Sequence, residues 1–207
     1  MEIGGVQFDG RVTLLVILST VVPMIDYYNQ TLTSVKAVDR FVFYFIIPIV
    51  VIYLVFRESP EAYGLRLGDW RTGLLWTVAG CVAMGLILWF VARQPGMAAF
   101  YQERAPATGG RILLLNGIEM WAWEFMWRGF LLFGLARAVG PGAAIWLQAI
   151  PFAFMHLGKP EVETYTTIFG GAAFGFIAWQ SGSFLYPFLI HWFILSFTML
   201  IATGRLG

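Results

Sequence analysis

Residues 72–92 read TGLLWTVAGCVAMGLILWFVA, a run of 21 positions without a charged side chain. A helix of about 20 apolar residues spans the hydrocarbon core of a bilayer, which is roughly 30 Å thick. The whole chain has the same character, because 59% of its 207 residues are hydrophobic and only 12% are charged. A soluble domain of this size could not bury so much apolar surface, and a disordered chain would not contain it.

Further apolar segments extend the pattern along the chain. They lie at about residues 12–25, 41–56, 112–139, 143–157, 165–180 and 184–202. The sequence therefore predicts an all-α fold, a polytopic membrane helical bundle of about seven transmembrane helices. Seven spans of about 20 residues leave about 67 residues for loops and ends, too few for a soluble domain. We expect residues 1–207 to form a single integral membrane domain.

The polar segments between the spans carry little information about partners. A formal net charge of +1 offers no basic surface for nucleic acid. Asp69 is placed to cap the helix that follows it, and residues 93–111 are predicted to be a polar loop. One membrane face would carry five Lys and Arg residues and the other seven, which is too even for the positive-inside rule to fix the orientation.

Charged residues inside an apolar segment indicate function. Residues 112–139 contain Glu119, Glu124 and Arg128, and three unpaired charges at mid-membrane would cost on the order of 8–10 kcal/mol. Glu124 and Arg128 are four residues apart, so we expect them to form an ion pair on one helix face. Glu119 lies about 140° around the helix from Glu124 and needs another explanation.

The two histidines of the chain complete a candidate hydrolytic centre. His156 and His191 both lie in or beside membrane segments. Together with a carboxylate, one imidazole can deprotonate a water molecule while the other stabilises an oxyanion. Glu124, His156 and His191 could equally hold a zinc ion that carries the attacking water. The sequence does not establish a cofactor, and zinc is the candidate that it allows.

Three short motifs resemble those of a known family. Residues 124–131 read EFMWRGFL, similar to a motif in which a pair of glutamates is followed by an arginine, often with a glycine after it. Phe152 and His156 match a second motif, phenylalanine, three residues, histidine, and His191 matches a C-terminal histidine motif. In order and spacing they resemble the CPBP family, the CAAX proteases and bacteriocin-processing (Abi) enzymes, over a motif-bearing core of about residues 112–202.

The resemblance implies an intramembrane endopeptidase in a bacterial inner (cell) membrane. Its partners would be the lipid bilayer and a peptide or protein substrate, membrane-associated or CAAX/bacteriocin-like. By resemblance, Glu124 and His156 would position the attacking water, His191 would stabilise the transition state, and Arg128 would hold Glu124. Metal dependence stays open, and nothing in the sequence encodes recognition of a prenyl group.

Two positions depart from the family pattern. Trp123 stands where the first glutamate of the pair is usual, and Glu119, one helical turn earlier, could supply the missing carboxylate. Leu195 stands where a small polar residue usually follows the last histidine, and Thr198 could partly replace it.

Beyond these motifs, Glu163 could hydrogen-bond into the site. The two departures also permit a catalytically inactive pseudoprotease that acts as a membrane binding or scaffold protein. A proton-coupled transporter that uses the same acids and histidines is the third hypothesis.

Overall fold

The computed structural model describes residues 2–28 and 32–206, and it is 79% helical. Helices are α1 (Gly10–Tyr28), α2 (Lys36–Phe41), α3 (Ile47–Val50), α4 (Trp70–Val91), α5 (Pro95–Arg104), α6 (Gly109–Glu124), α7 (Leu132–Val139), α8 (Pro141–Phe154), α9 (Glu161–Ser181) and α10 (Leu185–Ala202). Shorter segments are the π-helices η1 (Val42–Ile46), η2 (Val51–Phe56) and η4 (Phe125–Leu131), the 3₁₀ turn η3 (Pro60–Tyr63), and the antiparallel strands β1 (Glu2–Ile3) and β2 (Val6–Gln7).

The helices join into longer rods that match the apolar segments of the sequence. α2, η1, α3 and η2 follow one another without a break, as do α6, η4 and α7, so the predicted segments 41–56 and 112–139 are each one rod. Four helices are long and apolar enough to cross a membrane by length and composition, at Gly10–Tyr28, Lys36–Phe56, Trp70–Val91 and Leu185–Ala202. The prediction of an all-α membrane bundle is confirmed, and the count of seven spans is approximate.

Two boundaries differ from the prediction. Within the polar loop expected at residues 93–111 the structure has the short helix α5, which begins at Pro95, a residue that favours the first helical turn. The sequence did not predict this helix because most of its residues are polar or exposed, and only Met97 and Tyr101 are buried on it. α9 begins at Glu161 rather than near residue 165, with Glu161 and Glu163 in its first turn, where acidic side chains interact favourably with the helix dipole.

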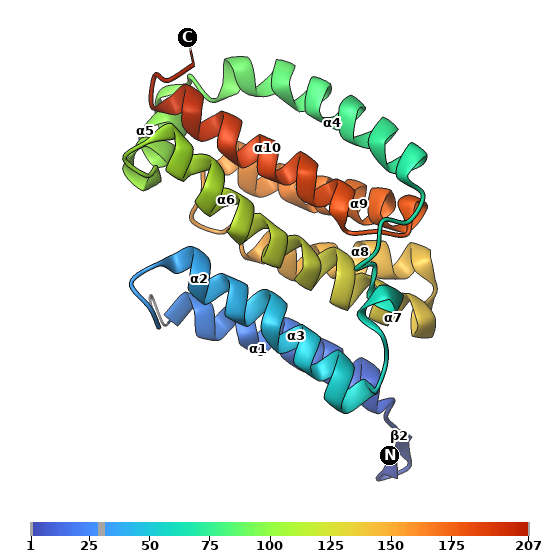
Figure 1. Ribbon diagram of the computed structural model, residues 1–207. Helices are drawn as coiled ribbons and strands as arrows, with labels where there is room; N and C mark the ends of the chain where they lie inside the picture. The colour runs from blue at the N-terminus through green and yellow to red at the C-terminus, as the bar shows by residue number, and fades with distance from the viewer. Residues whose placement is uncertain (1, 29–31, 207) are drawn as a thin grey trace.

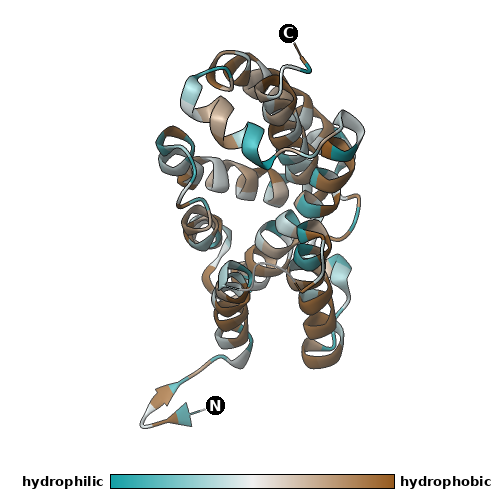
Figure 2. Cartoon of the chain, turned by 90° about the vertical axis from the view of Figure 1, so that its left-hand side faces the viewer, coloured by the Kyte–Doolittle hydropathy of each residue, from teal (hydrophilic) through white to brown (hydrophobic). Residues whose placement is uncertain are grey.

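The rods pack in layers (Figure 1). α1 and the α2–η2 rod lie on one side of the bundle, α4 lies on the opposite side, and α6, α8, α9 and α10 fill the space between them. α4 is lipid-facing in character, because only 6% of its most apolar stretch is buried, against 56% for α10. The helices are largely brown, the colour of apolar residues, in Figure 2. Large apolar side chains are exposed on them, as on α4 at Leu75, Leu86 and Phe90, which suits a lipid environment. The chain therefore forms an integral membrane protein.

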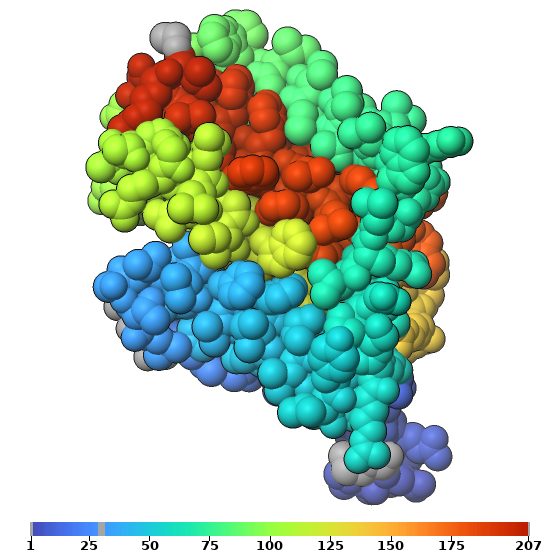
Figure 3. All heavy atoms as spheres, in the orientation of Figure 1, coloured from blue at the N-terminus to red at the C-terminus, as the bar shows by residue number. Residues whose placement is uncertain are grey.

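Residues 57–69 connect the α2–η2 rod to α4 and run across one end of the bundle (Figures 1 and 3). This connection is fastened to the turn between α9 and α10. The amide of Asp69 donates to the carbonyl of Ser181 at 2.7 Å, and the guanidinium of Arg66 donates to the carbonyl of Gly182 at 2.9 Å. Asp69 also accepts hydrogen bonds from the first amides of α4, so the predicted cap is confirmed. These contacts fix the start of α10, the helix that carries His191.

Gly68 makes this close approach possible, and its replacement tests it. Its φ of +61° belongs to the left-handed region, and a Cβ there would lie 2.0 Å from the carbonyl oxygen of Ser181. Gly68→Ala is expected to lower the free energy of unfolding by about 1–3 kcal/mol, measured by thermal unfolding in detergent. The control is Gly96→Ala in α5, where a Cβ meets nothing within 4 Å and the unfolding midpoint should not fall. Equal effects of the two substitutions would contradict the role given to Gly68.

Candidate active site

The motif-bearing rod changes its helical form where the motif begins. α6 ends at Glu124, and the following residues of η4 form a π-helix in which every side chain from Phe125 to Leu131 is buried. π-helical segments within α-helices are frequent at functional sites. Here the segment places Glu124 and Arg128 in the centre of the bundle, and both side chains are completely inaccessible to solvent.

Glu124, Arg128 and His191 form one buried cluster. Oε1 of Glu124 accepts a hydrogen bond from Nη1 of Arg128 at 3.0 Å and lies 2.5 Å from Nδ1 of His191. The guanidinium of Arg128 also donates to the carbonyl of Gly171 in α9 and lies 3.9 Å from the ring centroid of Phe152. The predicted ion pair is confirmed, and it also holds the imidazole of α10.

Both imidazoles are oriented through Nδ1. His156 follows the end of α8, and its Nδ1 lies 2.9 Å from the carbonyl oxygen of Phe152. Carbonyl and carboxylate oxygens only accept hydrogen bonds, so Nδ1 carries the proton in His156 and in His191. In its neutral form each ring therefore keeps a lone pair on Nε2, which can accept a proton.

Two cavities meet at these imidazoles. The polar cavity, of about 460 Å³, is lined by residues that include Lys36, Arg40, Glu119 and Trp123. The apolar cavity, of about 310 Å³, lies among α4, α5, α9 and α10 and is lined mostly by aliphatic and aromatic side chains. His156 and His191 line both cavities, which brings the two predicted histidines into one site.

The predicted carboxylates differ in their access to this space. Glu119 lines the polar cavity, where it forms an ion pair with Arg40 of α2. Glu124 lines neither cavity among the described residues, because its carboxylate is directed to Arg128 and His191 beneath the surface. Trp123 occupies the cavity wall, with its ring 6.3 Å from that of His156. Of the two acids, Glu119 is the one that a substrate in the polar cavity could touch.

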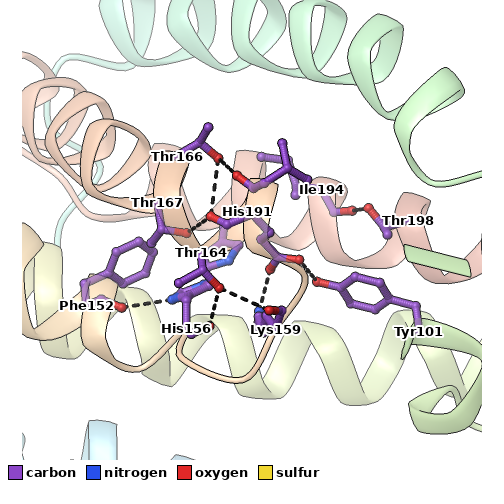
Figure 4. Close-up of polar contacts among 12 residues, drawn as sticks. Tyr101, Phe152, His156, Lys159, Thr164, Thr166, Thr167, His191, Ile194 and Thr198 are labelled. Atoms are coloured by element: carbon purple, nitrogen blue, oxygen red, sulfur yellow. Dashed lines mark hydrogen bonds and ion pairs between the residues drawn. The ribbon is translucent and has the colours of Figure 1, made fainter. Parts of the chain in front are cut away.

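The supporting residues lie around the two cavities. Thr198 lines the apolar cavity and donates its hydroxyl to the carbonyl of Ile194 at 2.7 Å, whereas Leu195 lines the polar cavity. Glu163 accepts hydrogen bonds from Tyr101 and Lys159 (Figure 4). Thus Glu163 lines the apolar cavity, and Thr198 and Leu195 face different spaces.

The sequence reasoning missed Arg40 and Tyr101. Both lie in polar segments whose pattern gave no sign of what they face, and their partners are far along the chain: Glu119 is 79 residues from Arg40, and Glu163 is 62 residues from Tyr101. An aromatic residue or a cation at the edge of a span is ordinarily an interfacial anchor, so residue type alone could not single them out.

The predicted zinc site at Glu124, His156 and His191 stays a prediction. Among the residues that the structure describes, no three His, Cys, Asp or Glu side chains are grouped so that they could hold a metal ion. Nδ1 of His191 is bound to Oε1 of Glu124 and Nδ1 of His156 to the backbone, which leaves Nε2 as the atom of each ring that could meet a substrate or a metal ion. The geometry presents two imidazoles and one accessible carboxylate.

Comparison with known proteins agrees with the three motifs. Residues 109–197 match the family described as Rce1-like: Type II CAAX prenyl endopeptidase Rce1-like. No curated protein and no solved structure matches the chain. The resemblance to the CPBP family inferred from the motifs is therefore confirmed over these residues by an Rce1-like match. The match supports, in general, an intramembrane CAAX-type endopeptidase with a peptide substrate and a bilayer as its surroundings.

The buried ion pair generates a test of stability. Arg128→Met leaves the Glu124 carboxylate buried without its cation and is expected to lower the free energy of unfolding by about 3–5 kcal/mol. The double variant Glu124→Gln/Arg128→Met should lose less than the sum of the single variants, because no uncompensated charge is left. Denaturant unfolding in detergent measures these values.

The control for this cycle is an exposed ion pair. Arg104 and Glu103 are 2.9 Å apart with side chains 48% and 77% exposed, so Arg104→Met should cost at most about 1 kcal/mol. Additive losses at Glu124 and Arg128 would show that the two side chains do not stabilise each other.

Proposed function

We propose that the protein is an intramembrane endopeptidase that hydrolyses a peptide bond where the two cavities meet. The observation that carries this proposal is that His156 and His191, each oriented through Nδ1, line the same two cavities. The polar cavity gives water access to the imidazoles, and the apolar cavity gives access to groups that lie in the lipid. A substrate in or at the membrane can therefore reach both.

In this proposal Glu119 and His156 activate the water. The carboxylate of Glu119 accepts a proton from water as the oxygen attacks the carbonyl carbon, and Nε2 of His156 accepts the second hydrogen bond. The proton then passes to the leaving amine, so that one water and one peptide bond give an acid and an amine. Arg40 forms an ion pair with Glu119 and is itself held by Asp26 at 3.2 Å. Glu119 thus takes the role that the resemblance gave to the motif glutamate.

His191 stabilises the oxyanion, and Glu124 positions His191. An imidazole can donate from Nε2 to an oxyanion only when it is protonated, because Nδ1 already carries its proton toward Glu124. The Glu124 carboxylate accepts the hydrogen bond of Nδ1 and so fixes the plane of the ring, as the buried acid of a catalytic triad does. Arg128 holds the carboxylate in place and compensates part of its negative charge.

The finer details of the function belong to the same proposal. We propose a CAAX-like or bacteriocin-like peptide as substrate and a bacterial inner membrane as location, supported by the family match over residues 109–197.

One observation favours the alternative of an inactive relative. Trp123 places an apolar ring on the cavity wall at the position of the first motif glutamate, and Glu119 is occupied by Arg40. A pseudoprotease of this kind would bind a membrane partner and cleave nothing. A proton-coupled transporter would instead carry protons through Glu119 and the histidines.

Cleavage of a peptide library by the purified protein tests the proposal. Mass spectrometry should detect new peptide ends with the unchanged protein, and Glu119→Gln or His156→Ala should lower kcat by about 10²–10⁴-fold. Glu124→Gln should also lower kcat, because His191 loses the group that orients it. Full cleavage by Glu119→Gln would exclude this acid as the base.

The controls separate the three hypotheses and the zinc mechanism. Glu103→Gln removes an exposed acid of α5 whose side chain is 77% exposed, and it should leave kcat unchanged. Activity that a chelator abolishes and zinc restores would favour a metal mechanism over the one proposed. No cleavage by any preparation would favour the pseudoprotease, and proton flux in liposomes that Glu119→Gln abolishes would favour the transporter.

A further inference from the structure

Three side chains separate the polar cavity from the apolar one. Besides His156 and His191, the third residue that lines both cavities is Tyr101 of α5. Its side chain is 4% exposed and packs against Met199 and Ala202 of α10. Tyr101 was absent from the sequence prediction, and the mechanism proposed above does not use it.

A chain of hydrogen bonds follows the boundary between the cavities (Figure 4). The hydroxyl of Tyr101 donates to Oε2 of Glu163 at 2.6 Å, and Nζ of Lys159 donates to Oε1 of the same carboxylate at 2.7 Å. Lys159 lines the polar cavity, whereas Glu163 lines the apolar cavity. The chain thus joins α5, the α8–α9 connection and the first turn of α9 across the boundary.

The hydroxyl of Tyr101 remains a donor in this setting. Burial and the neighbouring Glu163 carboxylate raise the pKa of Tyr101, so the phenol stays protonated. A hydrogen bond from a neutral donor to a carboxylate is stronger than one between neutral groups. The hydrogen bond between Tyr101 and Glu163 is therefore strong. It is nevertheless a single bond made by one short helix, so a substrate could break it.

We propose that Tyr101 is a specificity-determining residue that closes the passage between the two cavities through its hydrogen bond to Glu163. It must leave Glu163 before one extended substrate can occupy both cavities and place a peptide bond at His156 and His191. The proposal rests on the proposed peptidase function for its substrate, although the passage itself can be examined without cleavage.

The walls of the cavities define the substrate that would fit. On one side of Tyr101 are Lys36, Arg40 and Glu119, and on the other are aliphatic side chains of α4 and the ring of Phe174. A charged side chain would lose its hydration in the apolar cavity, where the one charged side chain among the described lining residues, Glu163, is already engaged by Tyr101 and Lys159. The substrate is therefore an extended peptide with an apolar stretch beside a polar one, and its scissile bond lies between them.

Thiol labelling measures whether Tyr101 closes the passage. In a Cys81→Ala background, which removes the single cysteine of the chain, Thr167→Cys places a thiol in the apolar cavity alone. Met155→Cys places one in the polar cavity alone. The protein in liposomes is treated with a sulfonate-bearing methanethiosulfonate, a charged reagent that enters lipid poorly, so that on this proposal the passage is its faster route from water to Thr167→Cys.

Tyr101→Phe removes the hydrogen bond and keeps the ring. We expect it to raise the labelling rate of Thr167→Cys by roughly 10–100-fold, because the free energy of one hydrogen bond to a carboxylate corresponds to a factor of this size. The labelling rate of Met155→Cys should stay unchanged. An unchanged rate at Thr167→Cys overturns the proposal. A rise of the same size at Met155→Cys also overturns it, because it indicates general loosening of the fold.

A matched control repeats the same chemical change elsewhere. Tyr63 donates its hydroxyl to Glu58 at 2.8 Å and lines neither cavity. Tyr63→Phe should leave labelling at both cysteines unchanged, and a rise at Thr167→Cys equal to that in Tyr101→Phe would count against a specific role for Tyr101.

Cleavage kinetics distinguish this proposal from the peptidase proposal. Tyr101→Phe should raise kcat/KM for a peptide with an apolar stretch and not for a uniformly polar peptide. If no peptide is cleaved but labelling changes as expected, the peptidase function fails and the closed passage stands. If peptides are cleaved and labelling is unchanged, the peptidase function stands and the role of Tyr101 is refuted.

Discussion

The bundle is organised around one carboxylate that has no access to water. Glu124 shares Oε1 between Arg128, four residues further along the same rod, and His191 of α10. A charge removed from water is tolerated only when opposite charges and hydrogen bonds replace its hydration, so the positions of η4 and α10 are tied to each other. Arg128 extends the constraint to α9 through the carbonyl of Gly171. The central interactions that hold the helices together are the same ones that orient an imidazole.

The contacts of Glu124 with Arg128 and His191 keep its carboxylate away from a substrate. A carboxylate held by an arginine and an imidazole below the cavity wall cannot also face a substrate, and Trp123 fills the neighbouring place on the wall. Glu119 reaches the polar cavity because it lies on another face of the same rod, where Arg40 meets it. In the proposed mechanism Glu119 therefore takes the place of the glutamate that the family motif has at Trp123.

The position of the imidazoles between two unlike cavities follows from the surroundings of the bundle. α4 has few fully buried side chains and forms one wall of the apolar cavity, whereas the cations of α2 and of the α8–α9 connection line the polar one. A site that is wet on one side and apolar on the other suits a substrate that is itself partly in the membrane. The contact between Tyr101 and Glu163 lies at the boundary, where α5 meets the first turn of α9.

The sequence determined what depends on local spacing. Apolar runs long enough to span a bilayer predicted the membrane bundle, the i, i+4 spacing predicted the pair Glu124–Arg128, and Asp69 was recognised as a cap. Only the tertiary structure decided which faces meet: that His191, 67 residues away, takes the carboxylate of Glu124, that Arg40 pairs with Glu119, and that α5 brings Tyr101 to Glu163. Helical spacing fixes the direction of a side chain relative to its neighbours in the chain, whereas a partner on another helix depends on how whole helices pack, which no local pattern records.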